Sequence, residues 1–221
     1  MLSKRLARIL DFIDEFDTVA DVGTDHGYLL EACIIQKHVK FCQGIENKEG
    51  PFLRASHNLN KYIEENKVIM SLSDGLNDLN DNINTVVIAG MGGELIAKII
   101  ECNLSKAKRL DKLILEANSK VFELRKFLSL RHFQIIDEDI VLDHSKYYEI
   151  IQVKFNELSP ELSTKSCFFG PKLMEKKSEV FIAKWNDKLN EINDIVKENP
   201  NLKTLNDVKQ IIEEVIHDKS C

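Results

Sequence analysis

Short apolar runs alternate with segments of helical periodicity between residues 18 and about 155 of this chain. Most of the runs end at a polar residue or a glycine, as buried strands of a parallel sheet do. Only residues 143–146 separate the last two runs, too few for a parallel crossover, so these two strands should pair antiparallel. The pattern predicts an α/β fold, a mostly parallel sheet with helices on both faces. The expected strands are Thr18–Val22, Phe41–Ile45, Val68–Leu72, Thr85–Ala89, Lys112–Glu116, Phe133–Val141 and Tyr147–Phe155.

The segments between these runs carry helix signals. Ser3 is expected to cap a first helix, and Ser119 to cap one that starts near Lys120. Pro51 suits a first helical position, where its missing N–H has no partner to lose. The expected helices are Lys4–Glu15, Gly27–Gln36, Pro51–Glu65, Glu94–Glu101 and Lys120–Leu130.

Beyond residue 156 the pattern becomes helical. A turn-like joint at 168–171 precedes a continuous helix expected from Lys172, and Asn199-Pro200-Asn201 should end it before a second helix. Apolar residues at spacings of three and four indicate an antiparallel helical hairpin with a coiled-coil-like seam. We therefore expect a sheet domain over 1–158 and a helical arm over 159–221. The seam residues are Trp185, Leu189, Ile192 and Val196, then Leu205, Val208, Ile212 and Val215.

Composition narrows the class of protein. The 221 residues carry a net charge of −6, and no apolar run approaches the length of a membrane span, so we expect a cytoplasmic protein. Five scattered cysteines without a C-x-x-C pair indicate reduced thiols and no metal site. The acidic balance argues against a surface coated for nucleic acid, but segment 104–131 has a net charge of +5 and segment 165–190 one of +3. These segments and the basic turn within 1–10 are either ordinary solvated faces or phosphate contacts.

The loop after the first strand carries unusual polarity. Gly23 and Gly27 enclose Thr24, Asp25 and His26, where a nucleotide loop needs only small residues. The middle glycine of a G-x-G-x-x-G dinucleotide loop is missing, which disfavours a nicotinamide enzyme. Acidic side chains repel pyrophosphate but suit a cationic ligand such as S-adenosylmethionine, which carries a sulfonium and an ammonium group.

Acidic residues also stand at the ends of three successive strands. Asp21 ends the first, Glu46 the second, and Asp74, followed by Gly75, comes directly after the third. Glu46 can accept hydrogen bonds from both hydroxyls of a ribose, and Asp74 from an adenine amino group. Glu46 and Asp74 could instead be helix-capping acids, but three acids at the ends of three successive strands favour a nucleoside cofactor.

A glycine block follows the fourth strand. Ala89-Gly90-Met91-Gly92-Gly93 opens a helix, and such a loop can lie flat against a ligand. A mere tight turn is the alternative.

Together these motifs resemble the TrmK family, bacterial tRNA adenine-N1 methyltransferases that modify the adenine at position 22. The resemblance covers nearly the whole chain and implies a Rossmann-like class I methyltransferase core, a C-terminal coiled-coil arm, S-adenosyl-L-methionine as cofactor, and tRNA as substrate. The matching residues are Leu2–Leu6, Asp21–Leu29, Gly50–Phe52, Asp74–Gly75, Ile88–Gly93, Tyr147–Glu149, Gly170–Pro171 and Lys184–Trp185.

The chain departs from the family in two places. Where the family usually has a Leu-Gln-Pro-Asn turn after the fifth strand, this chain has Leu115-Glu116-Ala117-Asn118, and Leu30 stands where a proline is usual. Asn118 matches. Glu116 brings negative charge towards a polyanionic substrate, and the sequence offers no reason for it.

The resemblance assigns roles to the residues. We expect Asp25 to bind the exocyclic amino group of the target adenine, with His26 or Tyr28 as second choices and Asn118 at the base edge. A monomer is expected, with the basic segments on the tRNA backbone. Methylation of another RNA or a small molecule, or RNA binding without catalysis, are the alternatives. The expected cofactor residues are Asp21, Gly23, Thr24, Tyr28, Glu46, Asp74, Gly75, Ala89, Gly90, Met91 and Gly92.

Overall fold

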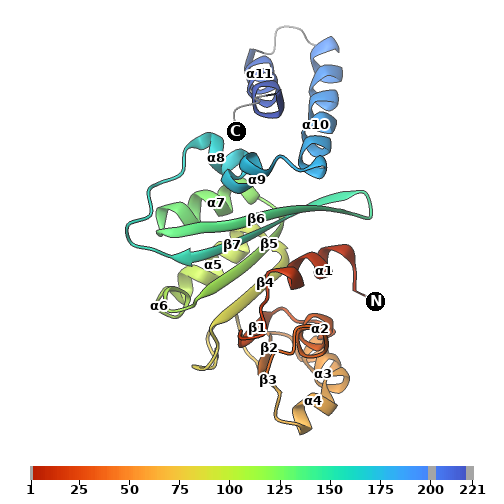
Figure 1. The fold of residues 1–221 in the computed structure, drawn as a ribbon, viewed down its shortest axis with the longest axis vertical. Helices are drawn as coiled ribbons and strands as arrows, with labels where there is room; N and C mark the ends of the chain where they lie inside the picture. The colour runs from red at the N-terminus through yellow and green to blue at the C-terminus, as the bar shows by residue number, and fades with distance from the viewer. Residues whose placement is uncertain (1, 199–202, 218–221) are drawn as a thin grey trace.

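The computed structural model of the protein describes residues 2–198 and 203–217. Its centre is a seven-stranded sheet with the order β3-β2-β1-β4-β5-β7-β6 (Figure 1). Strands β1 to β5 run parallel, and β7 pairs antiparallel with both β5 and β6. The predicted sheet is confirmed: β3 has its predicted bounds at both ends, and no strand end is shifted by more than three residues. The strands are β1 Val19–Val22, β2 Cys42–Glu46, β3 Val68–Leu72, β4 Thr85–Gly92, β5 Lys112–Ser119, β6 Phe133–Asp143 and β7 Lys146–Phe155.

Helices cover both faces of the sheet, as predicted (Figure 1). Successive strand side chains point to opposite faces. Val19 and Val87 pack in one apolar cluster with side chains of α1, α2 and α4. Val86 and Ile88 pack in another with side chains of α5 to α7. The helices are α1 Lys4–Asp11, α2 Tyr28–Gln36, α3 Glu49–Asn58, α4 Asn60–Glu64, α5 Gly93–Cys102, α6 Leu104–Lys108 and α7 Val121–Leu130.

The last two strands form a tight hairpin. Asp143 pairs with Lys146, so the turn consists of His144 and Ser145 alone, and both have positive φ, 46° and 62°. A two-residue turn with positive φ at both positions matches the twist of an antiparallel ribbon. The antiparallel pairing is therefore confirmed.

Several expected helix ends are wrong. Ser3 does cap α1, accepting the Leu6 N–H at 3.2 Å, but this helix stops at Asp11. Ser119 is no cap, because β5 extends to it through pairing with Gly92, and Lys120 at φ 60° precedes α7 instead.

Pro51 is likewise not a first helical residue. It is the third residue of α3, which begins at Glu49, and still lies in the turn where its missing N–H costs no helical bond. The single helix expected to Glu65 is divided at Leu59 into α3 and α4.

The helices that follow the sheet differ from the expected pair. Lys177, in the left-handed region at φ 44°, interrupts the helix expected to run unbroken from Lys172. Trp185 and Ile192 of α10 share a third apolar cluster with Ile212 of α11. The turn predicted at residues 199–201 lies outside the described residues, and the division into domains at residue 158 stays a prediction. The helices are α8 Thr164–Phe169, α9 Pro171–Lys176, α10 Glu179–Glu198 and α11 Lys203–His217.

A buried charge cluster ties these helices to the sheet. Arg125 of α7 is fully buried and binds Glu138 of β6 at 2.7 Å and Glu149 of β7 at 2.5 Å. Lys184 of α10 contacts the other oxygen of Glu149. Burial alone would raise the pKa of Glu149, but Arg125 and Lys184 outweigh it and hold that pKa below its usual value. Lys176 of α9 donates to the Glu138 carbonyl at 2.6 Å.

These contacts correct the reading of the basic segments. Arg125, Lys176 and Lys184 were expected among the tRNA contacts, but all three bind groups of the sheet. A count of lysines and arginines therefore overstates the positive charge that these segments offer to a phosphate backbone.

None of the described helices combines the length and the apolar character that a membrane span needs. Within residues 2–198 and 203–217, no group of three or more His, Cys, Asp or Glu side chains is arranged to hold a metal ion.

Replacing Lys184 by methionine should lower the free energy of unfolding by about 2 kcal/mol, because Glu149 stays buried with one cation fewer. Lys188→Met is the matched control: Lys188 lies four residues on in α10 and forms an exposed ion pair with Glu191, so its loss should cost less than about 0.5 kcal/mol. Urea unfolding of the three proteins measures both. Equal effects would show that the ammonium of Lys184 adds nothing to the cluster.

Candidate active site

A loop and a bulged strand end lie side by side at the centre of the sheet. Val22 of β1 pairs with Ile88 of β4, so the loop from residue 23 and residues 89–92 begin at the same level. Residues 89–92 are the end of β4, which stays paired with β5 through register shifts at Met91, and we call this bulged segment the glycine turn. The strand order reverses here, since β2 and β3 lie beyond β1 while β5 lies beyond β4. Open α/β sheets bind ligands at the carboxyl ends of their strands at such a reversal.

Close approach explains the first glycine of the loop. Gly23 has φ +78°, donates to the Ile45 carbonyl at 2.8 Å, and would meet the Met91 methyl at 2.6 Å if it carried a Cβ. Asp25 adopts φ +47°, a conformation that Asp tolerates better than most residues. The loop and the glycine turn are therefore packed against each other through Gly23 and Met91.

Ligand-sized space lies on both sides of Gly23. The first hollow, of about 210 Å³, opens over the ends of β1 to β3, and we call it the Glu46 hollow. It brings together five predicted residues, Gly23, Glu46, Asp74, Gly75 and Met91, with Lys48 at its rim. The full lining is Val22, Gly23, Ile45, Glu46, Asn47, Lys48, Ser73, Asp74, Gly75, Met91, Leu95 and Ile99.

The second hollow, of about 120 Å³, lies between the first loop, Ala89 and helix α1, and we call it the Arg5 hollow. It collects the remaining predicted residues of the loop and adds Arg5 from α1. Gly23 belongs to both hollows. The lining is Arg5, Leu6, Asp21, Gly23, Thr24, Asp25, His26, Tyr28, Leu29 and Ala89.

Asp21 is a buried carboxylate that lines the Arg5 hollow. Burial raises its pKa to about 6, and the negative charge of Glu46 adds to the effect, while Thr24 and Arg5 act against it. A carboxylate held at this cost to stability is suited to receive a positively charged group of a ligand.

Glu46 joins the loops around the first hollow. Its two carboxylate oxygens accept the backbone N–H groups of Asp25, at 3.3 Å, and of Asn47, at 3.1 Å. The Asn47 side chain in turn donates to Asp74 at 3.3 Å. Glu46 and Asp74, the acids predicted at the ends of β2 and β3, thus both line the Glu46 hollow.

Two of the three expected catalytic residues, Asp25 and His26, lie together in the lining of the Arg5 hollow, whereas Asn118 does not. The exposed Asp25 carboxylate binds Arg54 of α3 at 3.1 Å and lies 3.6 Å from Nε2 of His26. The His26 ring stacks on Tyr28 with 5.3 Å between centroids. The stacked rings of His26 and Tyr28 and the exposed Asp25 carboxylate together form a surface that a planar base can approach.

The glycine block is only partly a ligand surface. Gly90, at φ +77°, has its carbonyl bound by Asn118 at 2.7 Å and its N–H by Glu116 at 2.9 Å. Gly93 is required by packing, because a side chain there would strike the Lys120 carbonyl. Expected site residues Gly90, Gly92 and Asn118 are not among the lining residues of either hollow.

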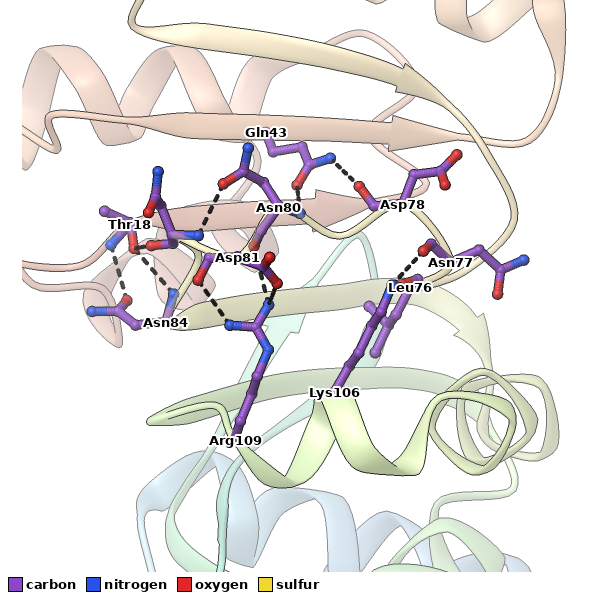
Figure 2. A network of polar contacts seen from close by, with 11 residues as sticks. Thr18, Gln43, Leu76, Asn77, Asp78, Asn80, Asp81, Asn84, Lys106 and Arg109 are labelled. Carbon is purple, nitrogen blue, oxygen red and sulfur yellow. Dashed lines mark hydrogen bonds and ion pairs between the residues drawn. The ribbon is translucent and has the colours of Figure 1, made fainter.

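Helix α6 fixes the chain that follows Gly75 (Figure 2). Lys106 donates to the carbonyl of Leu76 at 3.0 Å and also reaches that of Asn77. Arg109 binds the carbonyls of Asn80 and Asp81 at 3.1 and 2.8 Å. From β2, Gln43 donates to the Asp78 carbonyl at 2.8 Å and accepts the Asn80 N–H at 2.9 Å. Lys106 and Arg109, also expected as tRNA contacts, are thus used to hold this loop.

Sequence reasoning missed Arg5 and Arg54 as site residues. Arg54 lies one helical turn beyond Gly50 in α3, with no local signal that it faces Asp25. Arg5 did have a signal: Glu116 was an acid without an explanation, and a buried acid calls for a cation.

Comparison with known proteins shows which family the whole chain resembles. The family model described as "tRNA (adenine(22)-N(1))-methyltransferase" matches residues 19–220. The Bacillus subtilis tRNA (adenine(22)-N(1))-methyltransferase is 28% identical over 97% of both chains.

Two solved structures are similar to this chain over almost its whole length. A Streptococcus pneumoniae structure in complex with S-adenosyl-L-methionine has 34% identity and a TM-score of 0.88, over 98% of this chain and 100% of that one. The M. capricolum TrmK structure in complex with S-adenosyl-homocysteine has 25% identity and a TM-score of 0.80, over 97% and 96%.

Replacing Asp21 by asparagine should stabilise the protein at pH 8. The pKa of Asp21 is raised from 3.8 to about 6 in the folded protein, so keeping it ionised above pH 6 costs up to about 3 kcal/mol. The cost shrinks as the pH falls from 6 to 3.8 and is gone below 3.8, where the carboxyl becomes protonated in both the folded and the unfolded protein. Urea unfolding between pH 4 and 8 should show the gain of Asp21→Asn shrink with falling pH. A gain that is independent of pH would refute this account, and Asp78→Asn, at an exposed site, serves as control.

Proposed function

The chain belongs to the TrmK family of tRNA (adenine(22)-N(1))-methyltransferases, and we propose how its residues carry out that reaction. It transfers a methyl group from S-adenosyl-L-methionine to N1 of an adenine in tRNA. The observation that best supports this mechanism is the pair of hollows that share Gly23. One is lined by Glu46 and Asp74, acids that can bind a nucleoside, and the other is lined by Asp25.

The residues present fit the cofactor. S-adenosylmethionine supplies an electrophilic methyl group on a sulfonium. In the Glu46 hollow, Glu46 would accept the ribose hydroxyls and Asp74 the adenine amino group. Gly75 and Met91 line the space left for the ring. Asp21, buried with its pKa raised to about 6, would pair with the ammonium group, next to Gly23 and Thr24. Ala89 and Tyr28 would close the neighbouring Arg5 hollow, whereas Gly90 and Gly92, which line neither hollow, would act through the shape of the backbone around Met91.

The target base must come to the enzyme unpaired. N1 lies on the Watson–Crick edge of adenine, so a paired base cannot present it and has to be extruded into the site. N1 has a lone pair, so no base catalyst is needed to deprotonate it. The protein's work is therefore to hold N1 in line with the methyl group.

Asp25 is our proposed catalytic residue. Its carboxylate lies at the open edge of the Arg5 hollow and can accept a hydrogen bond from the exocyclic amino group of the adenine. The same negative charge stabilises the positive charge that develops on the ring. His26 and Tyr28 are placed to stack on the base, and Asn118 supports the opposing turn through Gly90.

Nucleoside mass spectrometry tests this function. Incubation of unmodified tRNA with the protein and S-adenosylmethionine should produce 1-methyladenosine, and nuclease mapping should place it at position 22. Methylation found only in another RNA or a small molecule would assign a different substrate. Cofactor binding without methylation of any RNA would favour a binding module.

Asp25→Asn is the informative variant for that assay, because asparagine tolerates positive φ and loses only the charge. We expect kcat to fall on the order of 100-fold, with the cofactor affinity within about twofold of wild type by calorimetry. Asp78→Asn, exposed and outside both hollows, should keep full activity. An unchanged kcat for Asp25→Asn would remove Asp25 from the mechanism.

We further propose that the protein acts as a monomer in the cytoplasm, where tRNA is found. Light scattering in solution should give the mass of one chain, 25.4 kDa. Twice that mass at the assay concentration would contradict a monomer.

A further inference from the structure

Glu116, which the sequence left unexplained, lies in β5 three residues before its end and pairs with Ala89, next to the glycine turn. Its side chain is completely buried. One carboxylate oxygen, Oε2, accepts the Gly90 N–H at 2.9 Å and the Arg5 guanidinium at 2.5 Å. The other, Oε1, has no hydrogen-bond partner among the described residues. A buried acid thus joins helix α1 to the turn that separates the two hollows.

Two side chains of β5 bind the backbone of Gly90, one at its N–H and one at its carbonyl. Glu116 takes its N–H, and Asn118, two residues on along β5, donates to its carbonyl at 2.7 Å. The third side is covered by Arg5, whose Nη1 would lie 3.3 Å from a Cβ at Gly90. These three contacts determine where the turn stands.

The position of the glycine turn determines the boundary between the two hollows. Met91 follows Gly90, lines the Glu46 hollow, and packs closely on Gly23. Because Gly23 lines both hollows, a displacement of Gly90 moves the wall that the two spaces share. The in-line approach of a nucleophile to a methyl group is sensitive to such a displacement.

Arg5 is itself fixed from several sides. Its backbone N–H donates to Asp143 of β6 at 3.1 Å, and its guanidinium lies 5.5 Å from the ring centre of Tyr148 of β7. It lines the Arg5 hollow beside Asp21 and Asp25. The positive charge that Glu116 holds there partly balances the acids of the site.

We propose that Glu116 and Arg5 are positioning residues for methyl transfer: Glu116 fixes the Gly90–Met91 turn, and Arg5 braces the turn and neutralises Glu116. The proposal rests on the proposed function. It requires that loss of Glu116 affect turnover more than cofactor binding, because the residue lines neither hollow.

Two substitutions separate the two tasks of Glu116. Glu116→Ala removes the acceptor for Gly90 and the partner of Arg5. Glu116→Gln keeps an oxygen for the Gly90 N–H but leaves Arg5 unpaired and places an amide where Oε1 has no partner. Glu157→Ala is the control, an exposed glutamate outside both hollows.

We expect kcat for tRNA methylation to fall at least tenfold in Glu116→Ala and two- to fivefold in Glu116→Gln, with KM for the cofactor changed less than threefold. In cofactor-free protein, hydrogen exchange of the Gly90 amide measured by NMR should speed up at least tenfold in Glu116→Ala. It should stay close to wild type in Glu116→Gln and Glu157→Ala.

Adding Arg5→Met to Glu116→Gln should recover part of the lost thermal stability, because the unpaired guanidinium is removed. Wild-type turnover and slow Gly90 exchange in Glu116→Ala would overturn the proposal. So would equal losses of turnover in the alanine and glutamine variants. An inactive wild-type protein would instead refute the proposed function, while the exchange result would still report on the turn.

Discussion

The parallel pairing of β1 with β4 at the centre of the sheet is the constraint on which the site depends. Val22 and Ile88 stand opposite each other, so the segments that follow them start at one level and must pass within contact distance. Glycine at residue 23 makes that passage possible, because the Met91 methyl occupies the place of its missing side chain. The two hollows exist as separate spaces because this contact lies between them.

The same crowding concentrates negative charge. Asp21, Glu46 and Asp74 end neighbouring strands, and the parallel register brings them to one edge of the sheet. The cost is visible at Asp21, whose pKa burial raises to about 6. Cations arrive from outside the sheet, Arg5 from α1 and Arg54 from α3. A site built in this way favours a ligand that is itself positive, and it admits a polyanion only where such arginines offset the acids.

The sheet could be predicted from the sequence because each strand is a local apolar run. The acids and glycines of the site could be predicted because they follow those runs directly. Contacts between segments that lie far apart in the sequence could not be predicted. Glu116 had no explanation without Arg5, 111 residues away, and Arg125 counted as a surface charge until two buried glutamates of β6 and β7 accounted for it. Lys177 broke an expected helix through a left-handed conformation that no local pattern marks.

Strand β7 connects these two sets of distant contacts. Successive side chains of a strand point to opposite faces, and Tyr148 and Glu149 are successive. Tyr148 lies beneath the Arg5 guanidinium on the face of α1, whereas Glu149 binds Arg125 and Lys184 on the face of the C-terminal helices. The anchor of α10 and the brace of the glycine turn are therefore one residue apart on β7, where it pairs with β6 just beyond its last pair with β5 at Ile150. The position of the C-terminal helices and the position of Arg5 are thus set by neighbouring residues of the same piece of backbone.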